Sequence, residues 1–240
     1  MVSAPARAAR RAPWGWLDVV LVLVSSLVFG LVFAGAVIGV VRHVDAALDA
    51  ATRGAVEALA GESVFYATAL SLTLLILALR HDVGVRDLGW RSASRRSMLS
   101  AIPLALLALL LAGGLGGLAQ SLMPHAATGQ CITVPRQYGH AAVLLLPVLC
   151  VAAPVVESTL FTGVLYRWLR GVLPLWSAMA VSAGLFALAH VNPVLFLPLA
   201  GLGVLLCWSY ERSASIWPGA AVYALFNLVG VVDILTAVRC

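Results

Sequence analysis

The chain of 240 residues is 62% hydrophobic and only 10% charged, with a mean hydropathy of +1.02. Ordinary soluble domains carry roughly 25% charged residues, so this composition excludes a soluble protein and indicates an integral membrane protein. A spanning helix needs about 20 apolar residues, so the length allows at most about eight crossings and leaves no room for a soluble catalytic domain. Any chemistry must therefore lie inside the helical bundle.

The formal net charge of +5 comes from arginines at the expected helix ends, since all fifteen basic residues are Arg and none is Lys. They do not form one stripe, so we expect the lipid bilayer, and no nucleic acid, as a partner. Four cysteines are scattered without a C-x-x-C pair, which indicates neither a disulfide framework nor a zinc cluster: Cys131, Cys150, Cys207 and Cys240. We expect no cofactor.

Hydrophobic runs predict an all-α fold, a polytopic transmembrane bundle of about seven spans. These runs cover residues 17–41, 64–79, 97–122, 141–169, 173–190, 194–210 and 216–236. The first run is too long for the core of a signal peptide and later spans follow it, so we expect an uncleaved helix. Residues 45–62 are alanine-rich and carry several acids, and we expect them to extend the first helix or to lie at the surface.

The distribution of arginine predicts the orientation of the bundle. With the N-terminus in the cytoplasm, eleven arginines face the cytoplasm: Arg7, Arg10, Arg11, Arg80, Arg86, Arg91, Arg95, Arg96, Arg167, Arg170 and Arg212. Only four face the other side, namely Arg42, Arg53, Arg136 and Arg239. Because cytoplasmic loops carry the excess of arginine, this split favours seven spans with a cytoplasmic N-terminus.

The chain divides into two predicted parts. Residues 1–63 hold an N-terminal tail, the first transmembrane helix and a polar helical segment. Residues 64–240 form the transmembrane bundle that contains the candidate site.

Glu157 is the residue around which this bundle is expected to be built, because it lies in the middle of the apolar run 141–169. A carboxylate at membrane depth costs at least about 2.5 to 3.5 kcal/mol, so it normally faces a protein interior or a wet cavity and has a partner. Pro147 and Pro154 interrupt the hydrogen-bond ladder of the same helix, and we expect a kink near Glu157.

Three further polar residues are candidate partners. Tyr223 and Asn227 are four residues apart and project from one face of the last helix, and Phe186 and His190 have the same relation on the fifth. Counting the helical rise from the cytoplasmic ends places Glu157 about 18 Å deep, Asn227 about 17 Å and His190 about 25 Å. His190 therefore needs helix tilt or a later helix start to reach the level of Glu157.

These residue types supply the parts of a hydrolytic site. Glu157 is suited to take a proton from water, and His190 to orient that water or to protonate the leaving amine. Asn227 and Tyr223 are suited to donate hydrogen bonds to a developing oxyanion. The same residues also fit a purely structural role, because Glu–His pairs and Asn or Tyr side chains often tie membrane helices together.

Two other functions are less well supported by the sequence. A zinc site usually uses three protein ligands, and only Glu157 and His190 are expected within the bundle, so we expect no metal. A proton-coupled transporter using Glu157 is disfavoured, because seven spans without an evident internal repeat do not match the usual inverted-repeat design.

Three segments resemble, in order and separation, the signature segments of the CPBP family of CAAX-protease and bacteriocin-processing membrane proteins. This family is also called Abi or type II CAAX prenyl endopeptidase-like. The segments are E-S-T-L-F-T-G-V-L from Glu157, F-A-L-A-H ending at His190, and the run 210–228 that contains Tyr223 and Asn227. The loop D-L-G-W-R at 87–91 is also similar, so the resemblance covers roughly residues 80–235.

The resemblance implies that Glu157 and His190 activate water, while the positions of Tyr223 and Asn227 stabilise the oxyanion. The family's first motif has a second Glu and an Arg where this chain has Ser158 and Thr162, and its third motif has His where this chain has Tyr223. Losing a Glu and an Arg four residues apart strands no uncompensated charge. Tyr in place of His keeps a hydrogen-bond donor but loses a group that becomes cationic near neutral pH.

Two functions follow from the resemblance. The first is a divergent intramembrane endopeptidase that hydrolyses peptide bonds of a membrane-associated protein or peptide with a Glu-activated water. The alternative is a catalytically inactive relative that acts as a peptide-binding, immunity or scaffold protein. Arginine without lysine is typical of GC-rich bacterial genomes, so the expected location is the bacterial cytoplasmic membrane; the sequence leaves the oligomeric state open.

Overall fold

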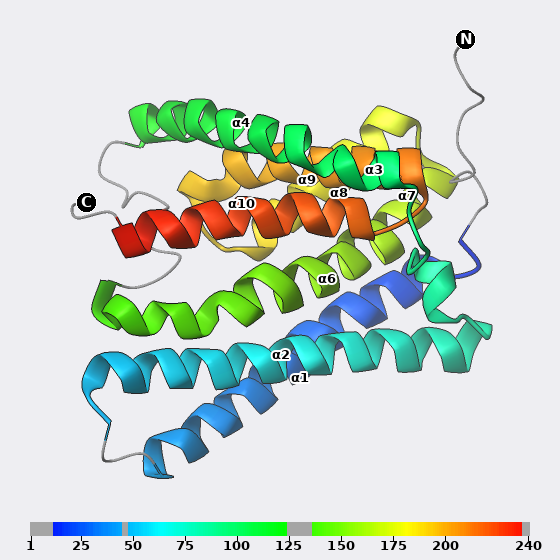
Figure 1. The fold of residues 1–240 in the computed structure, drawn as a ribbon. Helices are drawn as coiled ribbons and strands as arrows, with labels where there is room; N and C mark the ends of the chain where they lie inside the picture. Colours follow the sequence, from blue (N-terminus) through cyan, green and yellow to red (C-terminus); the bar gives the residue numbers. More distant parts are fainter. Residues whose placement is uncertain (1–11, 45–47, 124–135, 237–240) are drawn as a thin grey trace.

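A computed structural model describes residues 12–44, 48–123 and 136–236. Every regular element in these ranges is helical, which confirms the all-α prediction (Figure 1). The arginines before the first span, Cys131, Cys240, Arg239 and most of the predicted polar loop before residue 136 lie outside the described residues.

Five helices are long and apolar enough to cross a membrane: Trp16–His43, Ala50–His81, Arg95–Leu122, Ala141–Val172 and Pro193–Ser213. Two shorter apolar helices are Leu175–Ala189 and Trp217–Val232. These seven coincide with the seven predicted apolar runs and make a multi-pass membrane protein. The number of crossings and the side on which the N-terminus lies stay predictions.

The elements follow one another as α1 (Trp16–Val44), α2 (Ala50–His81), the short turn η2 (Val85–Leu88), α3 (Arg95–Leu99) and α4 (Ala101–Leu122). The chain continues with η3 (Arg136–Leu145), η4 (Val148–Ala152), α6 (Ala153–Glu157), η5 (Ser158–Tyr166) and α7 (Arg167–Val172). It ends with α8 (Leu175–Ala189), α9 (Pro193–Ser213) and α10 (Trp217–Thr236). The segment predicted to begin at residue 141 thus begins at Arg136.

The prediction for residues 45–62 was wrong, because most of this segment belongs to α2 and not to an extension of α1 or to the surface. Asp49 caps the helix by accepting hydrogen bonds from the backbone N–H groups of Ala51 and Thr52. From there α2 runs unbroken through 32 residues. The predicted boundary after residue 63 falls inside this helix. The acids in the first half of α2 therefore lie on a helix of the bundle.

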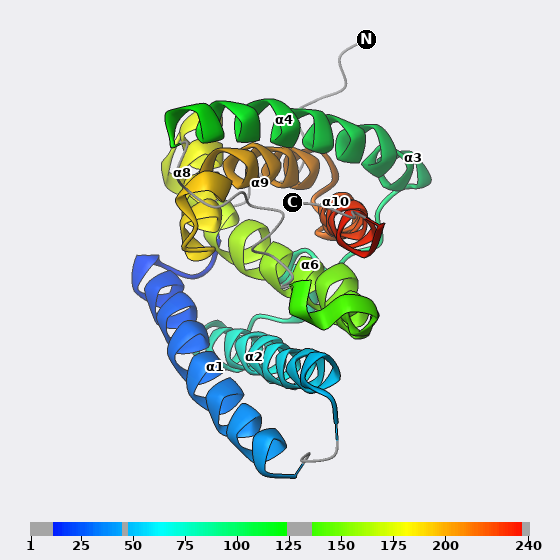
Figure 2. The ribbon, with the colours of Figure 1, turned by 90° about the vertical axis from the view of Figure 1, so that its left-hand side faces the viewer.

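α1 and α2 form an antiparallel pair at one side of the molecule (Figure 2). Gly30 lies against the ring of Phe65, and Gly61 lies against Ile38, so close that a Cβ on either glycine would come within 2.7 Å of its neighbour. Near the start of α1, the buried carboxylate of Asp18 accepts a hydrogen bond from Nε of Arg80 and lies 2.8 Å from Nε2 of His81. These contacts fix the register of the pair.

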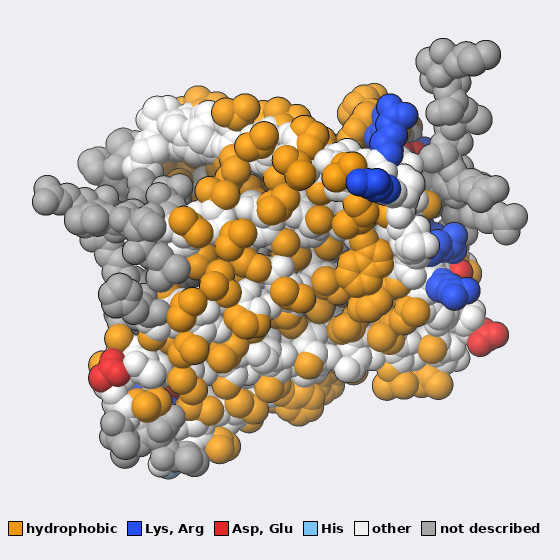
Figure 3. Space-filling model, viewed as in Figure 1, with side chains coloured by type: hydrophobic (Ala, Val, Ile, Leu, Met, Phe, Trp, Pro, Cys, Tyr) orange, Lys and Arg blue, Asp and Glu red, His pale blue; other side chains and the backbone are white. Residues whose placement is uncertain are grey.

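The helix that holds Glu157 lies between this pair and the remaining helices (Figures 1 and 2). α8, α9 and α10 pack on its other side, and α4 packs against α9 and α10. The surface is largely apolar, and arginines gather at the end of the molecule where α3 and α7 lie (Figure 3). Arg86, Arg91, Arg95 and Arg96 are exposed there, as expected of a charged loop at a membrane surface.

The helix from 141 to 172 is not a regular α-helix. Its hydrogen bonds widen to the π pattern at Val148–Ala152, return to the α pattern at Ala153–Glu157, and widen again at Ser158–Tyr166. The hydrogen-bond pattern thus changes near Pro147 and Pro154, whereas the kink expected near Glu157 stays a prediction. π-helical segments are rare and often lie at functional sites, and Glu157 is the last residue before the second one, which is nine residues long.

Candidate active site

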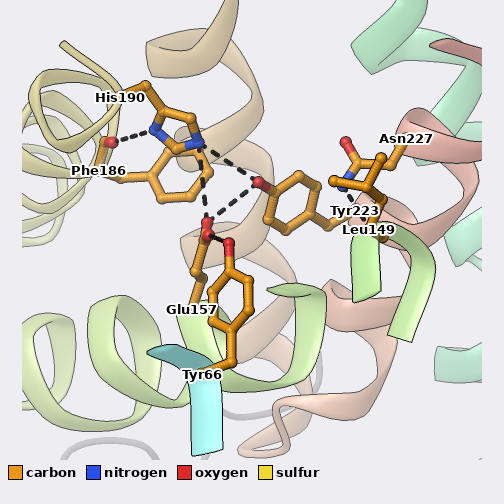
Figure 4. A network of polar contacts seen from close by, with 7 residues as sticks. All are labelled: Tyr66, Leu149, Glu157, Phe186, His190, Tyr223 and Asn227. Carbon is orange, nitrogen blue, oxygen red and sulfur yellow. Dashed lines mark hydrogen bonds and ion pairs between the residues drawn. The ribbon is translucent and has the colours of Figure 1, made fainter. Parts of the chain in front are cut away.

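Glu157 is the centre of a small polar cluster in the bundle. Its Oε1 accepts a hydrogen bond of 2.7 Å from the hydroxyl of Tyr66 on α2, and its Oε2 accepts one of 3.0 Å from Tyr223 on α10 (Figure 4). The Glu157 side chain is only 12% exposed. Two phenols from distant parts of the chain therefore take over the role that water plays for an exposed carboxylate.

His190 completes the cluster from the end of α8. Its Nε2 lies 3.8 Å from Oε2 of Glu157 and 3.4 Å from the hydroxyl oxygen of Tyr223. Its Nδ1 lies 2.9 Å from the carbonyl oxygen of Phe186, and because a carbonyl only accepts, this bond requires the hydrogen on Nδ1. The ring is thereby oriented so that Nε2 faces Glu157.

The expected depth mismatch between Glu157 and His190 disappears in the structure. The helix with Glu157 extends to Val172, and α8 begins only at Leu175. Both residues thus lie fifteen positions from the turn that joins their helices. Positions equally far from the turn of a helical hairpin lie at the same level, here about 22 Å from it.

Phe186 supports the cluster from below. Its ring is almost fully buried and makes edge contacts with His190 at 4.9 Å and with Tyr223 at 5.6 Å between centroids. The two polar rings therefore have one common apolar neighbour, which limits their rotation.

Asn227 has a different hydrogen bond from the one expected. Its Nδ2 donates to the carbonyl oxygen of Leu149 at 2.7 Å. In the π segment, Ala153 N–H bonds to the carbonyl of Val148, so the next nitrogen, that of Pro154, would face Leu149 but has no hydrogen. Asn227 supplies the missing donor and ties α10 to the helix of Glu157.

Ser158 and Thr162 stand where the family's first motif has Glu and Arg, and neither side chain carries a charge. Ser158 is buried and its Oγ has no hydrogen-bond partner among the described residues, whereas the hydroxyl of Thr162 donates to the carbonyl of Ser158. Thr159, one turn before Gly163, accepts a hydrogen bond of 3.0 Å from the indole N–H of Trp90. The side chains at 158 and 162 therefore need no counter-ion.

The loop before α3 fixes this helix from outside. The carbonyl oxygen of Leu88 lies so near Gly163 that a Cβ there would clash with it. Trp90 packs edge-on against Trp217 at 5.3 Å. Gly89 adopts a φ of 93°, which favours glycine, and its carbonyl accepts from Ile216 N–H. The D-L-G-W-R loop thus joins the helix of Glu157 to the start of α10.

Sequence reasoning missed Tyr66 and Glu62. Both lie on α2, four residues apart and therefore on one face. The four-residue spacing of Glu62 and Tyr66 could have indicated them. The prediction, however, placed Glu62 in the segment 45–62 and Tyr66 in the span 64–79, so the two were not considered together. No group of three His, Cys, Asp or Glu side chains among the described residues could hold a metal ion.

Comparison with protein-family models matches residues 139–229 to the family described as type II CAAX prenyl endopeptidase Rce1-like. Comparisons with curated proteins and with solved structures gave no match. The matched region is narrower than the predicted 80–235 and leaves out the D-L-G-W-R loop, but it contains Glu157, His190, Tyr223 and Asn227. The family is one of membrane proteases, which supports an intramembrane protease-type function. The resemblance seen in the three motif segments is thus confirmed, because residues 139–229 match the model of the Rce1-like family of type II CAAX prenyl endopeptidases.

Proposed function

We propose that the protein is a divergent intramembrane endopeptidase in which Glu157 is the general base. The observation that carries this proposal is the 3.8 Å separation between Oε2 of Glu157 and Nε2 of His190. One water molecule can contact both atoms at this separation, so the carboxylate can take its proton while the imidazole orients it. The hydrogen on Nδ1 of His190 leaves Nε2 of the neutral ring free to accept from that water.

The reaction begins with attack of the water oxygen on the carbonyl carbon of a peptide bond, as one water proton passes to Glu157. This forms a tetrahedral intermediate with a negatively charged oxygen. Protonated Glu157 is a weaker acceptor, so the hydroxyl of Tyr223 turns its hydrogen from Oε2 to the new oxyanion. The second amide hydrogen of Asn227 is a further candidate donor.

The substrate that fits this site is a membrane-associated protein or peptide. The cluster lies among apolar helices with lipid-facing surfaces, so a bond reaches Glu157 most readily from within the bilayer or from its surface. We propose the bacterial cytoplasmic membrane as the location, with the arginine-rich end of the bundle in the cytoplasm.

One observation favours the second candidate function, a catalytically inactive relative that binds a peptide or a partner membrane protein. Both oxygens of Glu157 already accept a hydrogen bond from a tyrosine. Such a carboxylate is well satisfied as a structural element, and a base must release one of these bonds to take a proton.

The deciding experiment uses the purified chain in lipid nanodiscs with a panel of quenched fluorescent peptides that carry one apolar spanning segment. We expect cleavage by the wild type and a loss of at least about 100-fold in Glu157→Gln, the size typical of a lost general base. Ser158→Ala serves as the matched control at the neighbouring position. Equal cleavage by wild type and Glu157→Gln, or binding of peptides without cleavage by either, contradicts the peptidase.

A further inference from the structure

A peptide bond breaks only when the leaving nitrogen receives a proton. His190 does not fill this step here, because its Nε2 carries no hydrogen and orients the water. Glu62 is a second carboxyl group beside the first. It lies one turn before Tyr66 on the same face of α2, and Tyr66 bonds directly to Glu157. Glu62 lies close enough to Glu157, Tyr66 and Tyr223 for its charge to interact with all three.

The two carboxyl groups have opposite hydrogen-bond environments. Glu157 accepts from two hydroxyl groups. Oε2 of Glu62 is buried and has no hydrogen-bond partner among the described residues. Burying a charge without donors costs far more than burying a neutral carboxyl group, so one negative charge between the two is best placed on Glu157. When two acids differ in this way, the one whose buried oxygen has no donor is suited to hold a proton and give it away.

Glu62 can also be reached from outside the bundle. A groove of about 450 Å³ between α1 and α2 is lined by Glu62, Phe65 and Gly61 at one end and by Arg42 and Glu57 at the other. Arg42 is the one cation among the described lining residues, and it forms an ion pair of 2.8 Å with Glu57. It therefore does not pair with Glu62. Phe65 packs edge-on against Tyr66 at 5.3 Å, which places the inner end of the groove beside the cluster.

We propose that Glu62 is the general acid of the site and donates a proton to the leaving amine, an inference that rests on the proposed peptidase function. Water gives one proton to Glu157 and its hydroxide to the carbonyl carbon. The C–N bond then breaks as the carboxyl hydrogen of Glu62 passes to the nitrogen, which gives a carboxylic acid and an amine. Transfer of the proton from Glu157 to Glu62 restores both groups.

The test compares two substrates of the same sequence, one with the ordinary peptide bond and one with an ester at the same position. An alcohol leaves far more readily than an amine without help from an acid. In Glu62→Gln we expect kcat on the amide to fall at least about 100-fold while cleavage of the ester changes by less than about threefold. Glu157→Gln is expected to lose both activities, because both need the activated water.

Two controls separate a catalytic from a structural role. Asp82→Asn removes an exposed acid at the C-terminal end of the same helix as Glu62, away from the groove, and is expected to leave both activities unchanged. Glu62→Asp keeps the acid and is expected to restore part of the amide cleavage.

Amide cleavage by Glu62→Gln at the wild-type rate overturns the proposal, and so does an equal loss on amide and ester. In either case Glu157→Gln still reports on the base by itself. If the wild type cleaves neither substrate, the peptidase function fails first and the role of Glu62 fails with it.

Discussion

Asn227 donates a hydrogen bond of 2.7 Å to the carbonyl oxygen of Leu149, which has no backbone donor because the residue five positions on is Pro154. The bond links α10 to the irregular helix about two turns before Glu157. The bond therefore contributes first to the stability of the packing between these two helices.

This pairing predicts a dependence between Asn227 and Pro154. Asn227→Ala is expected to lower the free energy of unfolding by about 1 kcal/mol, because it leaves a partly buried carbonyl without a donor. In a Pro154→Ala background the new backbone N–H can satisfy Leu149, so the same substitution is expected to cost much less. Unfolding of the four variants in mixed micelles measures the difference. An equal loss in both backgrounds contradicts the assignment.

Tyr66 is predicted to stabilise the protein through Glu157. Tyr66→Phe removes one donor from a carboxylate, and hydrogen bonds to charged groups contribute about 1.5 kcal/mol or more. The expected loss of stability should vanish in a Glu157→Leu background, where no charge is left to satisfy. A double-mutant cycle on unfolding free energies checks this. If Tyr66→Phe is equally costly in both backgrounds, the contribution of Tyr66 comes from packing.

Gly163 is predicted to be intolerant of even one added carbon. In Gly163→Ala the new Cβ would meet the carbonyl oxygen of Leu88, so the loop that carries Trp90 must shift. We expect a loss of about 1–3 kcal/mol in stability and a change in the fluorescence of Trp90. Gly184→Ala on α8 is the matched control, because nothing lies within 4 Å of its added Cβ. Similar behaviour of the two variants is the result that argues against close loop docking.

The orientation is predicted to place residues 82–94 in the cytoplasm. Single cysteines at Ser92 and at Leu48, in a background without the four native cysteines, can be tested with a membrane-impermeant maleimide on intact cells. Labelling is expected at position 48 and not at position 92 until the cells are permeabilised. The reverse pattern would invert the topology.

The apolar runs were sufficient to predict the helices, because a membrane span needs about 20 apolar residues whatever its neighbours are. The first half of α2 was missed because its polar, alanine-rich residues carry no hydropathy signal, and its course depends on packing against α1. His190 was placed at the right residue but at the wrong depth, because the ends of two helices were each misjudged by two or three residues.

The cluster itself was only partly predictable. Glu157, His190 and Tyr223 stood out as polar residues in apolar helices, and the structure brings them together. Tyr66 is 91 residues away from Glu157 in the sequence, and nothing local indicates that the two meet. The bond from Asn227 to Leu149 depends on the π hydrogen-bond pattern, which no residue spacing revealed.

The central claim is that Glu157 and His190 act together on one water molecule. The most direct test is kcat/KM for peptide cleavage by Glu157→Gln, His190→Ala and the double variant, all in nanodiscs. Residues that act as a unit lose activity together, so each single variant is expected to fall at least about 100-fold and the double variant no further. Wild-type activity in Glu157→Gln, or losses that multiply in the double variant, would contradict it.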